Sequence, residues 1–583
     1  MSARTSTSEL GGEIDAAYRA ALDSLVREDA VGRLFRRDAT LWKKDPEHQK
    51  IILNRLGWLD SPRWLRDHIP ELTAFAAEIR TEGFTRVLLL GMGGSSLAPE
   101  VLALVMRGAP GAPTLEVLDS TDPAAVRHAE SSHRLDRTFF LVSSKSGRTI
   151  ETLSQYRYFR TRLEETKVAD AARRFAAITD PGSALDRLAR EEGLRQVFLN
   201  PQDIGGRYSA LSYFGMVPAA LLGIHLEGFA ERAARAAEEA ASPEPARNDA
   251  LRLGAFLGAA AKAGRDKLTL LTSPTLRPLG YWIEQLLAES TGKEGGGIVP
   301  VEGEPPGFAR YYSSDRCFVS ITLAYEPAPE LSSLGAELRQ AGAPWVEITL
   351  ADRTELAAQF YRWEVATALA GATLEIDPFD EPNVQESKDN TAAILAEVER
   401  TGKPPTGEPR SREDRVAVFA SETLWSALTS KTPGHPSLEM LLGRFLALKK
   451  PNDYLAILAY LERTAATESA FAQLRREIRD AVRIPVLQGY GPRYLHSIGQ
   501  LFKGGPGTGM FLQITTEDAQ DLPIPGSRVT FGKLELAQAL GDFRSLDSRG
   551  KPALRLHISG SVAEGLATIA HAVERALVAL TPA

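Results

Sequence analysis

Residues 138–152, TFFLVSSKSGRTIET, contain the strand-to-helix transition on which the predicted fold rests. The first five are an apolar run with the length and composition of a buried strand. Hydroxyl residues, a lysine and a glycine follow, and a helical pattern then continues through Leu153 and Tyr156. Such a strand–loop–helix corner directs backbone N–H groups and hydroxyls at one point beside a positive helix end. Residues 143–152 are therefore a candidate phosphate loop, although a capped helix start without a ligand uses the same residue types.

Strands and helices alternate along most of the chain from Arg86 onward. The predicted strands are residues 87–90, 115–118, 139–142, 175–178, 197–199, 268–271, 318–323, 346–350, 486–487, 510–514 and 554–558. This rhythm predicts an α/β fold with doubly wound parallel sheets covered by helices on both faces. Ligands of such sheets bind outside the carboxyl ends of the strands, so the loops after the strands are the places to look for chemistry.

The order of patterns predicts four parts. They are a helical N-terminal segment (1–80), a first α/β domain (81–240), a second (250–400) and a C-terminal α/β section (414–583). Residues 241–249 and 401–413, rich in proline and charge, are predicted linkers. Helices are expected over residues 9–80, 415–429, 437–448, 452–463 and 563–580.

Composition limits the classes of function. The 583 residues predict two to four domains, and 43% hydrophobic with 25% charged residues is typical of a soluble globular protein. A net charge of −7 provides no general attraction to nucleic acid or to an anionic membrane. The single cysteine, Cys317, excludes an internal disulfide and a multi-cysteine metal centre. None of the nine histidines forms an HxxxH or HExxH pair, so no zinc site is indicated.

The N-terminal residues lack the apolar core of a signal peptide. Residues 208–226 are uncharged and long enough to cross a bilayer, but they include Ser209, Ser212, Gly215 and Pro218, which favours a buried helix. We expect a cytoplasmic protein.

Two glycine-rich turns follow predicted strands. Gly91-Met-Gly-Gly-Ser-Ser96 departs from a dinucleotide fingerprint because its third glycine position is Ser96, so it favours a turn that brings Ser95 near a small anion. A tight turn without a ligand is the alternative. In Gly205-Gly-Arg207 the arginine can hold an oxyanion, or it can be a solvated surface residue.

Gln285 and Glu289 are spaced i, i+4 on a predicted helix, so their side chains share one face. A carboxylate at that helix end can serve as a general base; the alternative is an exposed acid paired with Lys293. His496 follows a later strand and is isolated in the sequence, which by itself favours a structural over a catalytic histidine.

Five stretches together resemble the phosphoglucose isomerases, which contain two sugar-isomerase domains. They are residues 91–99 (GxGGSxxxP), 144–152 (SKTxTTxET), 205–207 (GGR), 285–293 (QxxxESxGK) and 379–388 (FDQxGVExxK). The tail, including residues 451–460 and 490–505, looks like the isomerase portion of fused transaldolase–phosphoglucose isomerases. The length leaves no room for a transaldolase barrel of about 250 residues in addition.

The resemblance implies reversible isomerisation of glucose 6-phosphate and fructose 6-phosphate through a cis-enediolate, without a metal or organic cofactor. It implies Glu289 as the base, Arg207 as the group that stabilises the enediolate, and His496 with Lys388 for ring opening. The implied substrate-binding residues are Ser95, Ser144, Lys145, Ser146, Thr149, Thr152 and Gln285. Alternatives are a sugar-phosphate isomerase that also accepts mannose 6-phosphate and a non-catalytic sugar-phosphate sensor.

The chain departs from the family pattern in several places. Ser146-Gly147-Arg148 stands where the family has Thr-Phe-Thr, and Glu381, Asn383 and Gln385 replace Gln, Gly and Glu. The histidine segment follows the lysine segment, the reverse of the usual order. In the family's common dimers the histidine comes from the neighbouring subunit; here we expect the C-terminal section to supply it within one chain, so the protein can be a monomer or a homodimer.

Overall fold

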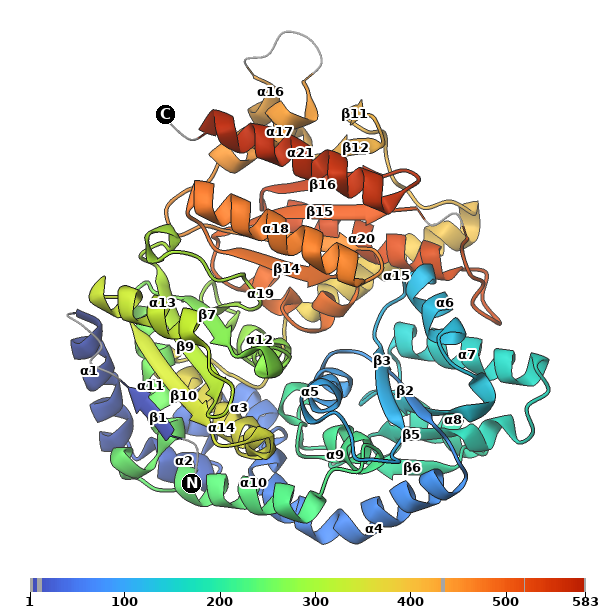
Figure 1. The fold of residues 1–583 in the computed structure, drawn as a ribbon, viewed down its shortest axis with the longest axis vertical. Helices are drawn as coiled ribbons and strands as arrows, with labels where there is room; N and C mark the ends of the chain where they lie inside the picture. The colour runs from blue at the N-terminus through green and yellow to red at the C-terminus, as the bar shows by residue number, and fades with distance from the viewer. Residues whose placement is uncertain (1–3, 8–12, 431–435, 518–519, 581–583) are drawn as a thin grey trace.

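The computed structural model describes residues 4–7, 13–430, 436–517 and 520–580 of the chain. Three β-sheets lie around a common centre, where helices α5 (Leu97–Met106), α12 (Leu279–Thr291) and α19 (Gly499–Gly504) meet (Figure 1). The predicted α/β class with helix-covered sheets is confirmed. None of the helices in the described part of the chain is both long and apolar enough to cross a membrane.

The first sheet is parallel throughout, with strand order β3-β2-β4-β5-β6. Its strands are β2 (Arg86–Gly91), β3 (Thr114–Leu118), β4 (Thr138–Ser143), β5 (Phe175–Thr179) and β6 (Gln196–Leu199), which confirms the five predictions. β4 is central and buried along its whole length. It ends at Ser143, and a loop connects it to α7 (Ile150–Glu165). The strand–loop–helix corner is therefore present as predicted.

The second sheet has the order β1-β10-β9-β7-β8. β7 (Lys267–Thr272), β8 (Val299–Val301), β9 (Arg316–Leu323) and β10 (Trp345–Leu350) are parallel, and three of them were predicted. β1 (Arg4–Thr7) pairs antiparallel with β10 at the edge. The N-terminal segment thus begins by completing a sheet formed from residues more than 250 positions later, which a local pattern cannot reveal.

The third sheet is mixed, with the order β11-β12-β16-β15-β13-β14. Its strands are β11 (Ser411–Glu413), β12 (Val416–Phe419), β13 (Tyr454–Tyr460), β14 (Val486–Tyr490), β15 (Gly509–Thr516) and β16 (Ala553–Ile558). The helix predicted over residues 452–463 is wrong, because β13 is a strand between β14 and β15. Its seven residues are all buried, and a short apolar run without periodicity does not distinguish a buried strand from a buried helix.

The helix predicted over residues 415–429 is also wrong in its first part, where β12 precedes α16 (Glu422–Thr429). β12 pairs antiparallel with β16, which satisfies backbone groups that the sequence alone assigned to a helix. The predicted linker at residues 401–413 includes β11. Of the predicted linker 241–249, residues 241–248 connect α10 (Leu226–Ala240) to α11 (Asp249–Lys262) and include the 3-10 helix η7 (Pro245–Arg247).

Helices join the first two sheets in one hydrophobic core. The N-terminal helices α1 (Glu13–Arg27), α2 (Ala30–Phe35), α3 (Pro46–Leu53) and α4 (Ser61–Thr81) contribute to it, together with α9 (Tyr213–Leu221), α10, α11 and α14 (Leu356–Leu374). α9, within the uncharged span 208–226, is buried at every position, as expected of a core helix. A shared core fixes the two sheets relative to each other and so fixes the loops that lie between them.

Candidate active site

Three loops from distant parts of the chain approach one another backbone to backbone. They carry the 3-10 helices η3 (Gly93–Ser95), η6 (Gly206–Tyr208) and η11 (Arg493–His496). A Cβ atom on Gly94 would lie 2.1 Å from the carbonyl oxygen of Gly206, and one on Gly93 would lie 2.4 Å from that of His496. Only glycine permits these contacts, so the glycine-rich turn packs against the arginine turn and the histidine turn.

Glu289 lies in the last turn of α12 with its side chain 15% exposed. The amide of Gln285, one turn earlier, donates to Glu289 Oε2 at 3.1 Å and to the carbonyl oxygen of His496 at 2.8 Å. Arg207 Nη1 is 3.4 Å from Glu289 Oε1. Burial raises the pKa of the Glu289 carboxyl to about 7, although Arg207 opposes the rise. This buried carboxylate can therefore accept a proton near neutral pH.

The Arg207 side chain is buried, and every nitrogen of its guanidinium has a partner. Nε donates to Ser290 Oγ at 2.8 Å, and Nη2 donates to the carbonyl oxygens of Pro378 and Asp380. Nη1 donates to Glu381 Oε2 at 3.0 Å, in addition to its contact with Glu289. Glu381 and Glu289 thus both contact Arg207 Nη1. Glu381, which departs from the family signature, is therefore linked to the candidate base through this arginine.

Lys293 does not pair with Glu289, so the alternative of an exposed acid paired with this lysine is wrong. Lys293 Nζ donates to the carbonyl oxygens of Asp377 and Asp380 and to Asp380 Oδ1, at 2.5 to 2.7 Å. Its side chain is 1% exposed. The lysine therefore holds the loop that carries Glu381 against the end of α12.

His496 contacts a carboxylate, Glu151, that the sequence patterns do not identify as a site residue. Its Nε2 lies 2.8 Å from Glu151 Oε1, and Gln538 Nε2 donates to the same oxygen at 2.7 Å. Although burial opposes the charged form, His496 holds the pKa of Glu151 below its ordinary value. The only sequence signal was its position directly before Thr152 in the phosphate-loop stretch; its two partners lie more than 340 residues away.

Hydroxyl groups of the predicted phosphate loop hydrogen-bond to one another and to the loop backbone. Ser144 Oγ is 2.9 Å from Thr149 Oγ1 and accepts from the backbone N–H of Gly147 at 3.1 Å. Lys145 points out of the loop, because its Nζ is 2.6 Å from Asp180 Oδ2 and 2.9 Å from a backbone oxygen of Gln202. The backbone N–H groups at the start of α7 and the Ser144–Thr149 pair are therefore the groups best placed for an anion.

The remaining predicted residues lie around this loop with different exposure. Ser95 is buried in η3, and its carbonyl oxygen accepts from Ser143 Oγ at 3.1 Å. Ser146 is exposed, whereas Thr152 is fully buried. Lys388, on α15 (Val384–Thr401), is exposed and close enough to Glu151 to lower the pKa of that carboxyl. Within the described ranges, no group of three or more His, Cys, Asp and Glu is arranged to hold a metal ion.

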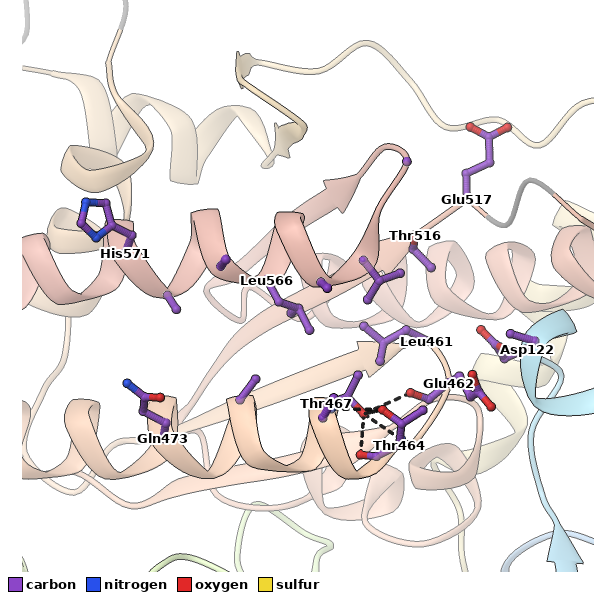
Figure 2. Close-up of a pocket in the computed structure, with 18 of the residues that line it drawn as sticks. Asp122, Leu461, Glu462, Thr464, Thr467, Gln473, Thr516, Glu517, Leu566 and His571 are labelled. Atoms are coloured by element: carbon purple, nitrogen blue, oxygen red, sulfur yellow. Dashed lines mark hydrogen bonds between the residues drawn. The ribbon is translucent and has the colours of Figure 1, made fainter. Parts of the chain in front are cut away.

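A groove of about 1180 Å³ lies elsewhere, between α18 (Ala465–Val482) and α21 (Val562–Leu580) of the C-terminal section (Figure 2). Its lining includes Leu461, Thr467, Leu566 and His571, and it contains none of the predicted site residues. The chemistry predicted from the sequence is therefore not associated with this groove.

Solved structures share this architecture. The chain aligns with a hypothetical protein from Thermus thermophilus at a TM-score of 0.58 and 23% identity, covering 68% of this chain and all of that one. A glucose-6-phosphate isomerase from Chlamydia trachomatis aligns at a TM-score of 0.53 and 18% identity, covering 65% of this chain and 86% of that one. The fold thus defines the class, an α/β protein built on parallel sheets as in these structures.

Sequence comparisons narrow the class to a family. A family model described as phosphoglucose isomerase matches residues 74–297. A glucose-6-phosphate isomerase from Symbiobacterium thermophilum is 31% identical over 391 residues, which are 58% of this chain and 86% of that protein. Another from Rubrobacter xylanophilus is 29% identical over 391 residues, covering 58% and 89%. The chain belongs to the phosphoglucose isomerase family.

Proposed function

We propose that the protein interconverts glucose 6-phosphate and fructose 6-phosphate, with Glu289 as the base. The observation that carries the proposal is the Glu289 carboxylate, buried beside Arg207 and Gln285 with a pKa of about 7. A base of this pKa can take a proton from C2 of the sugar and return it to C1 at neutral pH. The relatives named as glucose-6-phosphate isomerases support the choice of substrate.

In this mechanism the Arg207 guanidinium stabilises the negative charge of the enediolate. Its position is rigid, because Ser290 and two backbone carbonyls hold it before substrate arrives, so little reorganisation accompanies charge development. His496, oriented by Glu151, assists opening of the sugar ring, and Lys388 is the second group for that step. The enediolate needs no metal or organic cofactor.

The phosphate group of the substrate is held at the start of α7 by Ser144 and Thr149, with Ser95 and Ser146 beside them. Binding of the phosphate, which is remote from C1 and C2, orients these reacting carbons. Damage to the loop therefore lowers turnover as well as affinity. A sugar-phosphate isomerase that also accepts mannose 6-phosphate would use the same base and the same phosphate loop. We also propose that the C-terminal section corresponds to the isomerase portion of fused transaldolase–phosphoglucose isomerases.

The test is a coupled assay with fructose 6-phosphate on the wild type and on Glu289→Gln. We expect kcat/KM to fall by about 10³-fold, within the range usual for loss of a general base. Glu294→Gln is the matched control, because Glu294 is half exposed and pairs with Lys43. Equal activity of the wild type and Glu289→Gln would remove Glu289 as the base. Inactivity of both, with retained binding of fructose 6-phosphate, would favour a sugar-phosphate sensor.

We further propose that one chain contains a complete site. Support comes from the hydrogen bond between Gln285 and the backbone of His496 within the same chain. A monomer is then sufficient for activity, whether or not it dimerises. Sedimentation of active enzyme as an obligate dimer, with His496 crosslinked to the other chain's α12, would contradict this.

A further inference from the structure

A second cavity lies in the C-terminal section, apart from the candidate active site. It has a volume of about 520 Å³ and lies between residues 405–410, β12, β16 and α20 (Phe531–Ser548), elements labelled in the upper part of Figure 1. Its lining is apolar at Pro405, Pro409, Phe419, Ala420, Leu540 and Phe543 and basic at Arg410, Arg544 and Arg555. This size is typical of sites for small organic ligands.

Arg555 of β16 is the buried polar group of this cavity, with 2% of its surface exposed. Its guanidinium carbon is 3.7 Å from the centre of the Phe419 ring. Nη2 donates to the carbonyl oxygen of Thr406 at 3.1 Å, and within the described part of the chain the buried Nε has no hydrogen-bond partner. Among the residues that the structure describes, no carboxylate lies within ion-pair distance of this arginine.

The other arginines that are buried to the same degree are all paired. Arg86 lies 2.6 Å from Glu116, Arg316 lies 2.7 Å from Glu304, and Arg479 lies 2.6 Å from Asp480. Arg555 therefore stands apart from them. At these three sites a carboxylate compensates the buried guanidinium, whereas around Arg555 none of the described carboxylates does so.

An uncompensated buried charge destabilises a folded protein, and an apolar side chain of similar volume is often neutral or stabilising in its place. Burial alone lowers the pKa of Arg555 to about 10, so the surroundings disfavour its charge without removing it at neutral pH. The aromatic contact with Phe419 recovers part of this cost. An anion entering the cavity would recover much more, because a charge-assisted hydrogen bond is strongest where water is excluded.

We propose that this cavity is a binding site for a small organic anion, whose phosphate or carboxylate group lies on Arg555 and whose body packs against Phe543 and Leu540. Arg544, exposed on α20, adds positive charge at the entrance. Of the other charged groups, Arg410 is paired with Glu422 at 2.8 Å, and Glu408 is an exposed carboxylate at the rim. The balance at the cavity is positive, which matches an anionic ligand.

The larger groove of Figure 2 has different chemistry. Glu462, Glu477, Glu517 and Glu574 make its lining acidic, and the hydroxyls of its threonines at the start of α18 hydrogen-bond within the capping box. Among the lining residues that the structure describes, no buried side-chain polar atom lacks a partner. The anion site is therefore assigned to the cavity of Arg555.

The test is titration calorimetry of the whole protein with two probes, adenosine 5′-monophosphate and citrate. We expect at least one to bind the wild type with a dissociation constant below about 1 mM, and Arg555→Met to weaken binding about 10- to 100-fold. Without a probe, Arg555→Met should melt at the same temperature as the wild type or higher. Arg544→Met should weaken binding several-fold, and Arg528→Met, at an exposed arginine outside the cavity, should not.

A double substitution in the phosphate loop, Ser144→Ala with Thr149→Ala, separates this cavity from the active site. Binding that survives this change and is lost in Arg555→Met supports the proposal. Binding of only one probe also supports it and identifies the oxyanion as phosphate or carboxylate. Failure of both probes to bind the wild type, or binding that Arg555→Met leaves intact, would overturn it. If Arg555→Met does not fold, an unchanged affinity of Arg544→Met overturns it.

Discussion

Glu381 should tune the proton affinity of the candidate base, and its replacement by Gln is the sharpest test of the site geometry. Glu289 must be ionised to accept a proton, so kcat/KM falls as the pH drops through its pKa of about 7. The negative charge of Glu381 is one of the causes that raise this pKa. Glu381→Gln removes that charge, so the pKa of Glu289 should fall and the acid limb of the profile should move to lower pH.

The magnitude follows from the shared guanidinium nitrogen. Glu381 Oε2 and Glu289 Oε1 lie 3.0 and 3.4 Å from Arg207 Nη1. The two oxygens are thus at most about 6.4 Å apart, and two unit charges at this separation repel by roughly 3 kcal/mol at an effective dielectric constant of about 20. The Glu381 side chain is 40% exposed, so water and salt screen part of this repulsion. A shift of about one pKa unit remains.

The assay is kcat/KM for fructose 6-phosphate between about pH 5.5 and 9, values chosen to span about two units around the pKa. A shift of one unit makes the ratio of activity at about pH 6 to that at about pH 8.5 roughly fivefold larger in Glu381→Gln. The phosphate of the substrate titrates equally in assays of the wild type and the variant. A difference between their pH profiles therefore reflects a group of the protein. Glu386→Gln, which removes a carboxylate paired with Arg549, should leave the profile unchanged. An acid limb that does not move in Glu381→Gln would refute the coupling through Arg207.

Two further predictions concern the framework of the site. Gly147, in the candidate phosphate loop, has φ +65°, and an added Cβ would lie 2.2 Å from the backbone nitrogen of Leu185. Gly147→Ala should therefore lower the free energy of unfolding by about 2 to 4 kcal/mol and, by distorting the loop, raise KM. Gly182→Ala, with φ +71° and open space around it, should cost only about 1 kcal/mol in denaturant unfolding; equal losses would contradict the steric argument. Arg493 Nη1 lies 2.8 Å from Asp119, so Arg493→Met should destabilise the protein by about 3 to 5 kcal/mol and lower kcat by displacing the histidine turn. Unchanged melting and kcat would show that this ion pair does not position the turn.

Much of the fold could be predicted from the sequence because its signals are local. Alternating apolar runs and amphipathic stretches identified all five strands of the first sheet. β13 was mistaken for a helix because its apolar run has neither a period of 2 nor one of 3.6. What makes it a strand is the pair of neighbours, β14 and β15, that hydrogen-bond to it on both sides.

In the candidate site, too, some features could be predicted from local sequence and others depend on tertiary contacts. The spacing of Gln285 and Glu289 determined that they share a helix face, and the glycines before Arg207 determined a tight turn. The partners came from tertiary structure: Glu151 and Gln538 for the histidine, Glu381 for the arginine and Asp380 for Lys293.

The α/β class and the positions of the candidate loops could be predicted from the amino-acid sequence, since backbone periodicity and turn formation depend on neighbouring residues. Which buried charges meet depends on how distant segments pack together. Packing of segments far apart in the chain raises the pKa of Glu289 and leaves Arg555 without a carboxylate among the residues that the structure describes. Burial and charge pairing are properties of that packing, and no local pattern encodes them.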